Sequence, residues 1–403
     1  MMYHNPVLLN ESVAGLNIDE NGIYVDVTFG GGGHSREILG KLGKKGRLIA
    51  FDQDQDALEN IINDDRFLLI NKNFMYLKEN LLSINIDKVD GILADFGISS
   101  HQIDVPDRGF SIRYDANLDM RMDQNSELKA VDIINNYSFD QLAKIFFDYG
   151  ELRMARLIAR KIVEARLISE IKTTLELNNL LLSILPKKRS NKLLAQIYQA
   201  LRIEVNSEID VIKSFLIQTK DVLRQKGRLS VISYHSLEDR LVKRFIRSGL
   251  FQGDAEKDIY GNEKLPFSKV GKLIVPTEDE IKLNNRARSA KLRIAEKNQI
   301  MKNKIIQFIR GSFLLSKDSS KNWSLILFFS FLSLLMINSS HSVDKKIHEI
   351  ARINESVKSL RSEFVDTRTI LIRYKMESTV SKKINEMGIS SSTEPPIKII
   401  VNK

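Results

Sequence analysis

The sequence predicts an α/β protein in which a doubly wound parallel sheet carries an inserted helical domain and is followed by one transmembrane helix and a coiled-coil helix. Three observations lead to this fold class. In the first third, short apolar runs alternate with stretches of helical periodicity, a pattern typical of parallel strands covered by helices. From 108 to 206 the periodicity is almost entirely helical. Between Lys321 and Asp344 lie 22 residues without a formal charge.

The composition narrows the chemistry available to the chain. Of its 403 residues, 43% are hydrophobic and 28% are charged, an ordinary globular balance that supports a buried core. The absence of cysteine excludes disulfides, cysteine-ligated zinc, iron–sulfur clusters and thiol catalysis. We predict no metal site. A net charge of +10 favours phosphate-rich partners or an anionic membrane surface.

The expected sheet begins just before a run of glycines. Residues 22–29 form an apolar strand that leads into Gly30–Gly33, and residues 34–42 are expected to form the first helix. Because the strands are apolar along nearly their whole length, both faces of the sheet should be covered. The elements that follow are a strand at 46–52, a helix at 56–62, and strands at 67–70 and 89–95.

A helical insertion separates two stretches of the sheet domain. The sheet domain is predicted to comprise 1–107 and 207–298, with the helical domain at 108–206 between them. Helical periodicity in the insertion is clearest at 149–165 and 192–205. After the insertion we expect a strand at 228–234, a helix at 236–247, loops over 250–285 and a basic run at 286–293.

The uncharged stretch at 322–343 predicts a transmembrane helix. At ~1.5 Å per residue it spans roughly 33 Å, enough for a bilayer core. The alternative is a buried core helix, which the serines within the stretch would allow. The linker before it, at 299–321, is rich in lysine, so this side of the span is expected to face the cytoplasm.

A coiled-coil helix is predicted at 344–378, and a tail at 379–403. Apolar residues recur there every seven positions, which favours a parallel coiled coil. A solitary amphipathic helix is the alternative, because Lys346 and Thr367 interrupt the second apolar position of the repeat. The recurring residues are Val343, Ile350, Val357, Phe364 and Leu371.

The glycine cluster after the first strand points to a bound nucleotide. Glycine lets the chain turn tightly and lets a ligand approach the backbone. A Walker-type phosphate loop would need Gly-Lys-Ser or Gly-Lys-Thr, which is absent, and a strict GxGxxG pattern does not fit because Ser35 or Arg36 takes its last place. Taken alone, the cluster is also compatible with a simple turn.

Residues at three further strand ends support a nucleoside pocket. Asp52 ends the second strand, where a carboxylate can accept hydrogen bonds from both ribose hydroxyls. Phe74 follows the third strand and could lie against an adenine, and Asp95 ends the fourth strand. Since the carboxyl ends of parallel strands meet at one edge, we expect a shared crevice. A helix N-cap is the alternative for Asp52, and a dehydrogenase and a methyltransferase both remain open on these residues alone.

Long motifs in a fixed order then favour one of these classes. They are Tyr3-His-Asn-Pro-Val-Leu-Leu9, Asp26-Val-Thr-Phe-Gly-Gly-Gly-Gly-His-Ser35, Asp95-Phe-Gly-Ile-Ser-Ser-His-Gln-Ile-Asp104, Arg108-Gly-Phe-Ser111, Leu118-Asp-Met-Arg-Met-Asp123, Gln199-Ala-Leu-Arg-Ile-Glu-Val-Asn206, Ser233-Tyr-His-Ser-Leu-Glu-Asp-Arg240 and Arg286-Ala-Arg-Ser-Ala-Lys-Leu-Arg293. Over residues 1–298 the chain resembles the RsmH (MraW) family of class I methyltransferases. The resemblance implies N4-methylation of a decoding-region cytidine (position 1402) of 16S rRNA.

The resemblance also implies the cofactor and its contacts. Asp52 would bind the ribose, Phe74 would flank the adenine, and Asp95 would help to close the pocket. Two positions depart from the family: Gly31 stands where many members have arginine, and His101 where many have proline, so the loop at 101 is expected to be less rigid. The residues expected to hold S-adenosyl-L-methionine are Gly32, Gly33, His34, Asp52, Phe74, Asp95 and Gln102.

The group that prepares the cytosine amine for attack is not identified by the sequence. The lone pair of this amine is delocalised into the ring, so an acceptor must hold its N–H groups and align it with the methyl group. The segment Asp95-Phe-Gly-Ile98 lacks the prolines common in amino-methyltransferases. Asp95 and the loop with Ser233 and His235 are candidates, against a pure cofactor role for Asp95 and a structural role for His235. No catalytic residue is assigned.

The predicted partner of the enzyme is the small ribosomal subunit with its 16S rRNA. The target cytosine must be unstacked or presented in a loop before it can react. Three basic groups are expected to follow the RNA phosphates. These groups are Lys187-Lys188-Arg189, Arg240/Lys243/Arg244/Arg247 and Arg286/Arg288/Lys291/Arg293.

The last hundred residues resemble a different family. The stretches Lys321-Asn-Trp323, Ser339-Ser-His-Ser342 and Leu360-Arg-Ser-Glu-Phe-Val-Asp-Thr-Arg368, together with the span and the heptads, resemble FtsL-type division proteins of the Bacteroidetes. This resemblance implies a divisome partner for the coiled coil. It also implies a cytoplasmic methyltransferase tethered to the inner membrane through 322–343. The alternative is a membrane-anchored division scaffold in which the methyltransferase domain is dispensable, and two neighbouring genes read as one chain would give the same sequence.

Overall fold

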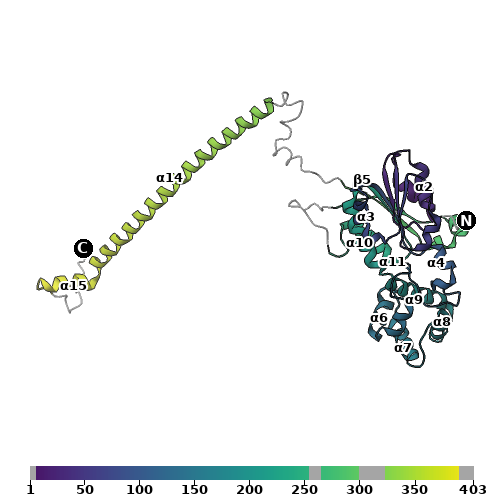
Figure 1. Cartoon of the computed structure of the whole chain (residues 1–403). Helices are drawn as coiled ribbons and strands as arrows, with labels where there is room; N and C mark the ends of the chain where they lie inside the picture. The colour runs from purple at the N-terminus through teal and green to yellow at the C-terminus, as the bar shows by residue number, and fades with distance from the viewer. Residues whose placement is uncertain (1–5, 254–264, 299–322, 390–403) are drawn as a thin grey trace, which may run out of the picture. The chain divides into compact units, whose positions relative to one another are not determined.

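The computed structural model describes residues 6–253, 265–298 and 323–389 (Figure 1). The chain divides into two compact units, Met1–Ile300 and Met301–Lys403. The predicted linker at 299–321 lies outside the described residues, as does the part of the predicted tail after residue 389.

The first unit is built on a seven-stranded sheet with the strand order β3-β2-β1-β4-β5-β7-β6. Strands β1 to β5 run parallel to one another, as predicted. Strand β7 is antiparallel to both β5 and β6, so the prediction of a wholly parallel sheet is wrong at this edge. The strands are β1 (Ile23–Asp26), β2 (Arg47–Phe51), β3 (Phe67–Ile70), β4 (Val89–Asp95), β5 (Leu223–Ser233), β6 (Phe267–Ile274) and β7 (Lys291–Lys297).

The antiparallel strand β7 overlaps the segment at 286–293 that was predicted only as a basic run. In β7, charged residues stand between and beside the buried Leu292 and Ala295, so the segment has too few consecutive apolar residues to be recognised as a core strand. Arg228 of β5 lies directly opposite Glu296 of β7, and the two form an ion pair at 2.8 Å. Such cross-strand pairs stabilise the register, and they become visible only when distant segments are side by side.

Helices cover both faces of the parallel strands, which accounts for their nearly continuous apolar runs. Successive residues of β1 point to opposite faces: Tyr24 packs in one cluster with α1 and α2, and Val25 packs in another with α3, α10 and α11. The segment predicted as a helix at 56–62 is a short 3-10 helix. The elements are α1 (Leu9–Gly15), α2 (Gly33–Lys41), η1 (Gln55–Asn60), η2 (Phe74–Tyr76), α3 (Leu77–Ser83), α10 (Glu208–Val222), α11 (Ser236–Ser248), α12 (Glu278–Leu283) and η5 (Asn285–Ser289).

Residues 110–205, between β4 and α10, form a hydrophobic core of their own. Phe146 of α6, Ile158 of α7 and Leu201 of α9 are completely buried in it. Figure 1 shows α6 to α9 grouped below the sheet. The domain boundaries at 108 and 206 stay a prediction. The helices of this part are α4 (Ser100–Asp104), η3 (Pro106–Arg108), α5 (Ala130–Asn136), α6 (Phe139–Asp148), α7 (Ala155–Arg166), α8 (Thr174–Leu182), η4 (Lys187–Arg189) and α9 (Ser190–Val205).

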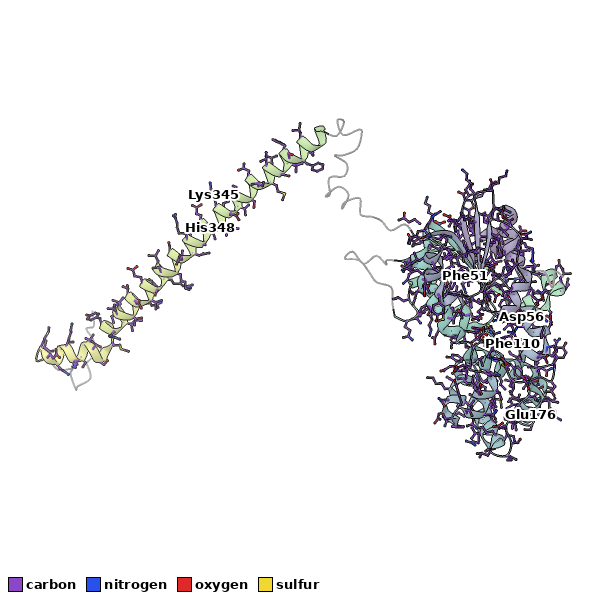
Figure 2. All side chains as sticks on the ribbon, in the orientation of Figure 1. Phe51, Asp56, Phe110, Glu176, Lys345 and His348 are labelled. Atoms are coloured by element: carbon purple, nitrogen blue, oxygen red, sulfur yellow. The ribbon has the colours of Figure 1, made fainter. Side chains whose placement is uncertain are left out.

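The described part of the second unit, residues 323–389, contains a long helix, α14 (Trp323–Lys375), and a short one, α15 (Glu377–Glu386). Side chains project from α14 on all sides (Figure 2), and heptad residues such as Val357 are exposed. Of the segment predicted at 344–378, residues 344–375 are helical in α14, and Met376 separates α14 from α15. Pairing into a coiled coil stays a prediction. No helix in the described ranges is both long and apolar enough to cross a membrane. The transmembrane helix predicted at 322–343 is therefore not confirmed, and residue 322 lies outside those ranges.

Candidate active site

The carboxyl ends of β1, β2 and β4 meet where the strand order reverses. β1 and β4 are neighbours in the sheet, with β2 on the other side of β1. The loop after β1 contains the glycine cluster, Asp52 follows β2, and Asp95 ends β4. Doubly wound sheets bind their ligands in the crevice at this point. The structure thus gives the predicted site residues a common location.

Two glycines of the loop adopt left-handed backbone conformations. Gly30 has φ +49° and Gly32 has φ +74°, and Gly32 is the N-cap of α2. A Cβ atom on Gly33 would lie 2.1 Å from the ring of Pro6. Gly32 is therefore required by the turn, and Gly33 by the packing of α2 against the N-terminal segment. Contact of either residue with a cofactor stays a prediction.

Asp52 holds the glycine loop in place and can still bind a ligand. Its Oδ2 accepts a hydrogen bond from the backbone N–H of Gly30 at 2.7 Å, and its Oδ1 accepts one from the N–H of Asp54 at 2.9 Å. Burial raises the pKa of the Asp52 carboxyl to about 6, although both hydrogen bonds act in the opposite direction. Each carboxylate oxygen has a further lone pair, so Asp52 can accept hydrogen bonds from a ribose.

Asp95 is enclosed by three side chains at the end of β4. Its backbone N–H donates to the hydroxyl of Thr28 at 2.7 Å, and its Oδ1 accepts from the hydroxyl of Tyr234 at 2.8 Å. Its Oδ2 lies 3.9 Å from Nδ1 of His34, whose Nε2 donates to the carbonyl of Val7 at 3.2 Å. Burial raises the pKa of Asp95 to about 6, and the nearby His34 opposes this shift.

Phe74 and Gln102 both contact other protein side chains. The ring of Phe74 stacks on Phe96 with the centroids 6.1 Å apart, and it meets Phe215 edge-on at 5.4 Å. The side-chain amide of Gln102 is buried and donates to Asp54 at 2.6 Å. Gln102 therefore braces the loop that follows Asp52. Direct contact of Phe74 and Gln102 with the cofactor stays a prediction.

Sequence reasoning missed several residues that support the site. Asp26, at the end of β1, is completely buried and accepts a 2.7 Å hydrogen bond from Ser35, and burial raises the pKa of its carboxyl. Arg108 is buried and bridges Asp54, at 2.9 Å, and Asp56. The position of Asp26 directly before the glycine loop was a usable signal. Nothing in the local sequence connects Arg108 with Asp54.

Several arginines of the predicted RNA-binding groups form ion pairs within the protein. An arginine held in this way has less capacity to bind a phosphate, so the geometry does not support RNA contact through these side chains. The pairs are Arg293 with Asp239 at 2.7 Å, Arg240 with Glu151 at 2.6 Å, and Arg286 with Asp104.

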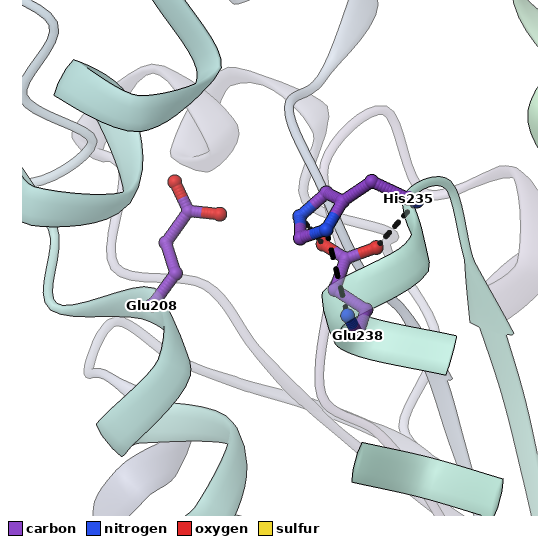
Figure 3. Close-up of side chains that lie close together, drawn as sticks. All are labelled: Glu208, His235 and Glu238. Carbon is purple, nitrogen blue, oxygen red and sulfur yellow. Dashed lines mark hydrogen bonds and ion pairs between the residues drawn. The ribbon is translucent and has the colours of Figure 1, made fainter. Parts of the chain in front are cut away.

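A narrow pocket adjoins the crevice on the side of α10 and α11. Gly97, just after β4, lines it together with Glu208 and Glu238. His235, one of the predicted candidates for the acceptor, lies against Glu238 (Figure 3). The nearest nitrogen and oxygen atoms of Glu208, His235 and Glu238 are all within 4.8 Å of one another. Sequence reasoning did not select the two glutamates, because nothing local distinguishes them from surface acids.

The first 298 residues match the MraW methylase family. The chain belongs to this family. The resemblance drawn from the motifs is thereby confirmed, and the methyl donor of this MraW methylase is S-adenosyl-L-methionine, as predicted.

Curated relatives align over the same part of the MraW methylase. The ribosomal RNA small subunit methyltransferase H of Flavobacterium johnsoniae is 62% identical over 297 residues, which is 74% of this chain and 98% of that protein. The protein of the same name from Bacteroides thetaiotaomicron is 52% identical over 298 residues, or 74% of this chain and 98% of that protein. Among solved structures, Aeropyrum pernix fibrillarin with bound S-adenosyl-L-methionine covers 73% of this chain and 84% of its own, at 7% identity and a TM-score of 0.31, which is too distant to support an argument.

Residues 306–403 match a second family, the Bacteriodetes cell division protein (FtsL-like). This match confirms the resemblance drawn for the last part of the chain. The two matched regions follow one another without overlap, so the chain joins an MraW methylase to an FtsL-like segment.

The groups in the crevice fit S-adenosyl-L-methionine. Asp52 has acceptor capacity for a ribose, and the backbone at Gly31 is open, since a Cβ atom placed there would meet nothing within 4 Å. Asp95 places a carboxylate on the same sheet edge, where it would balance the positive sulfonium. When bound, the cofactor supplies an electrophilic methyl group. The residues of the chain have to orient it and to prepare the acceptor.

Proposed function

We propose that residues 1–298 methylate N4 of a decoding-region cytidine of 16S rRNA. The observation that carries the proposal is the convergence of Asp52, Asp95 and the glycine loop at the reversal point of the sheet, in a chain that belongs to the MraW methylases. The name of the curated relatives, which specifies the small ribosomal subunit, supports the choice of substrate.

The proposal includes the cofactor contacts expected from the sequence. Asp52 would accept hydrogen bonds from the ribose, Phe74 would flank the adenine, and Asp95 and Gln102 would help to close the pocket. The loop would contribute mainly its backbone, because the side chain of His34 is directed to Val7. The proposed contact residues are Gly32, Gly33, His34, Asp52, Phe74, Asp95 and Gln102.

Methyl transfer to small ribosomal subunits tests the proposed function. The full chain, S-adenosyl-L-methionine and subunits that lack the modification should yield N4-methylcytidine at the decoding-region position, detected by mass spectrometry of digested 16S rRNA. Asp52→Asn should abolish the product, whereas Asp65→Asn, at an exposed position after β2, should not. A chain that binds the cofactor and leaves every cytosine N4 unmodified contradicts the proposal.

A second function is supported by the FtsL-like match. We infer that residues 306–403 act in cell division at the membrane, through a coiled coil at 344–378 that pairs with a divisome subunit. In the strongest form of this inference the methylase is dispensable for division. A full-length Asp52→Asn chain should then restore division in a deletion strain and appear in the membrane fraction. Failure to restore division contradicts the scaffold function.

A further inference from the structure

Tyr234, the residue directly after β5, reaches across the sheet edge to the carboxylate that ends β4. β5 is the parallel neighbour of β4, and Ile232 lies opposite Asp95 in the register. The Tyr234 hydroxyl donates to Oδ1 of Asp95 at 2.8 Å. The Tyr234 ring packs against a buried cluster that includes Val7 and Ala290. Sequence reasoning did not select this tyrosine, because its partner lies on another strand.

The two oxygens of the Asp95 carboxylate have different surroundings. Oδ1 accepts the hydrogen bond from Tyr234, whereas Oδ2 lies 3.9 Å from Nδ1 of His34, which is beyond hydrogen-bond distance. His34 is the second residue of α2, which begins at the end of the glycine loop, so Oδ2 lies on the side of that loop. The side chain of Asp95 is 21% exposed. A ligand in the crevice can therefore reach Oδ2.

The Tyr234 hydroxyl acts as the donor in its contact with Asp95. Burial, and after it the charge of Asp95, raises the pKa of the hydroxyl well above its ordinary value, so the proton stays on the tyrosine oxygen. A hydrogen bond to an ionised carboxylate is stronger than one to a neutral group. Tyr234 thus favours the ionised form of Asp95 and fixes the direction of the carboxylate.

The backbone of Tyr234 is held by a buried pair of side chains in the turn after β5. Oε2 of Glu238 accepts from the backbone N–H of Tyr234 at 2.8 Å and from that of His235 at 3.3 Å. Oε1 of Glu238 pairs with Nε2 of His235 at 2.9 Å (Figure 3). Glu238 is completely buried, so we assign it to holding this turn. The pair fixes one end of the tyrosine whose other end contacts Asp95.

Gly97 leaves room for the Tyr234 ring. It lies just after β4 with φ +110°, and a Cβ atom there would lie 3.2 Å from Cδ2 of Tyr234. A side chain at Gly97 would press on the ring, and a shifted ring would carry the hydroxyl away from Asp95. The hydrogen bond between Tyr234 and Asp95 therefore depends on the packing of β4 and β5 as well as on the two residues.

We propose that Tyr234 is a positioning residue for S-adenosyl-L-methionine, and that its hydroxyl holds the Asp95 carboxylate so that Oδ2 faces the positively charged sulfonium. This inference rests on the cofactor contacts of the proposed function. A carboxylate attracts a nearby positive charge, whereas a protonated or rotated carboxyl group does so much less. S-Adenosylhomocysteine lacks this charge and is otherwise closely similar. The difference in affinity between the two ligands therefore isolates the contribution of Asp95.

The groups around Asp95 determine the pH at which this contribution is present. Burial raises the pKa of the Asp95 carboxyl to about 6. His34 and the hydrogen bond from Tyr234 oppose this rise, and the carboxyl groups of Asp26 and Glu238 add to it. Since the ionised form exists above the pKa, the preference for the charged ligand should appear as the pH rises through about 6. Without the Tyr234 hydroxyl it should appear at a higher pH.

Tyr234→Phe removes the hydroxyl and keeps the ring and the backbone N–H. Isothermal titration calorimetry of the full chain between pH 5 and pH 8 gives the dissociation constants of S-adenosyl-L-methionine and S-adenosylhomocysteine. Any dependence on Asp52 is common to both ligands and cancels in their ratio. In Tyr234→Phe the rise of the preference should move up by about one pH unit, which lowers the preference at pH 6 about fivefold. Tyr114→Phe, at a largely exposed tyrosine, is the matched control and should keep the wild-type curve.

Two further variants separate positioning of Asp95 from a merely structural role of Tyr234. Asp95→Asn should make the ratio nearly independent of pH, and Tyr234→Phe added to it should change the ratio no further, because the two residues act as one unit. Gly97→Ala keeps the hydroxyl but displaces the ring, so it should lower the preference in the same direction as Tyr234→Phe.

Three results would overturn the assignment: a wild-type ratio that is flat from pH 5 to pH 8, a Tyr234→Phe chain with the wild-type curve, or a Tyr234→Phe effect that is equally large in the Asp95→Asn chain. If Tyr234→Phe does not fold, a Gly97→Ala chain with the wild-type preference overturns it. A wild-type chain that shows the pH-dependent preference and methylates no cytosine N4 refutes the proposed substrate instead and leaves the role of Tyr234 intact.

Discussion

The affinity of the MraW methylase for its cofactor should rise with pH through about 6. Asp52 must be ionised to accept hydrogen bonds from both ribose hydroxyls. In the structure, burial raises the pKa of its carboxyl to about 6, against the hydrogen bonds from the N–H groups of Asp54 and Gly30. Below that pH most of the free protein therefore carries a protonated Asp52 that has to lose its proton when the cofactor binds.

The size of the effect follows from the titration of one carboxyl group. With a pKa of about 6, about a tenth of Asp52 is ionised at pH 5 and about nine tenths at pH 7, so the dissociation constant should fall about tenfold between them. This corresponds to ~1.4 kcal/mol of binding free energy. Asp95, whose pKa is also raised to about 6, should add to the dependence for the positively charged sulfonium.

Isothermal titration calorimetry of the full chain between pH 5 and pH 8, at constant ionic strength, measures both contributions. S-Adenosylhomocysteine, which lacks the positive charge, should show the Asp52 dependence and little of the Asp95 dependence. Asp52→Asn should weaken the binding of S-adenosylhomocysteine at pH 7 and make it nearly independent of pH. Asp65→Asn is the control and should keep the wild-type slope. A wild-type affinity that is flat over this range, or an Asp52→Asn chain with an unchanged slope, would refute the reasoning.

The remaining predictions concern stability. Carboxyl groups with a raised pKa are stabilised in the protonated form, so their contribution to the unfolding free energy of the unbound protein should be lost as the pH rises from about 4 to about 6; a urea series that shows a gain there would contradict this. Arg108→Ala should destabilise the protein by about 3–5 kcal/mol, because Asp54 keeps a buried charge without its partner. Lys41→Ala removes one side of an exposed ion pair and should change stability by less than about 1 kcal/mol. Equal effects of the two substitutions in urea unfolding would disprove the distinction. Gly97→Ala should cost about 1–3 kcal/mol through its positive φ and also slow methyl transfer, and Gly31→Ala, where a Cβ meets nothing, should be close to neutral by circular dichroism melting.

Local patterns were sufficient for the parallel part of the sheet. Each of β1 to β4 is an uninterrupted apolar run with a turn or a polar residue at its end, and burial on both faces requires that pattern. The residue that follows such a run is at the carboxyl edge of the sheet by topology alone. Asp52 and Asp95 could therefore be assigned to the same crevice before any contact was known.

The antiparallel edge of the sheet and the long-range side-chain contacts that support the site could not be found in this way. β7 mixes charged with apolar residues because its charges are partnered across the sheet, as Arg228 and Glu296 show. The side-chain amide of Gln102 donates to Asp54, a partner far away in the sequence that no local pattern indicates. The hydrogen-bond or ion-pair partner of a polar side chain depends on distances that exist only in the folded chain.

The amino-acid sequence by itself determined the family, the methyl donor, and the strand ends that form the crevice, because these depend on residue order along short segments. Tertiary structure alone decided which hydrogen-bond partners each polar side chain has in the folded protein. The buried carboxylate of Asp54, for example, accepts hydrogen bonds from the side chains of Gln102 and Arg108, which lie far from it in the sequence. Hydrogen-bond capacity is a property of the three-dimensional surroundings, since the same carboxylate on an exposed helix would be satisfied by water.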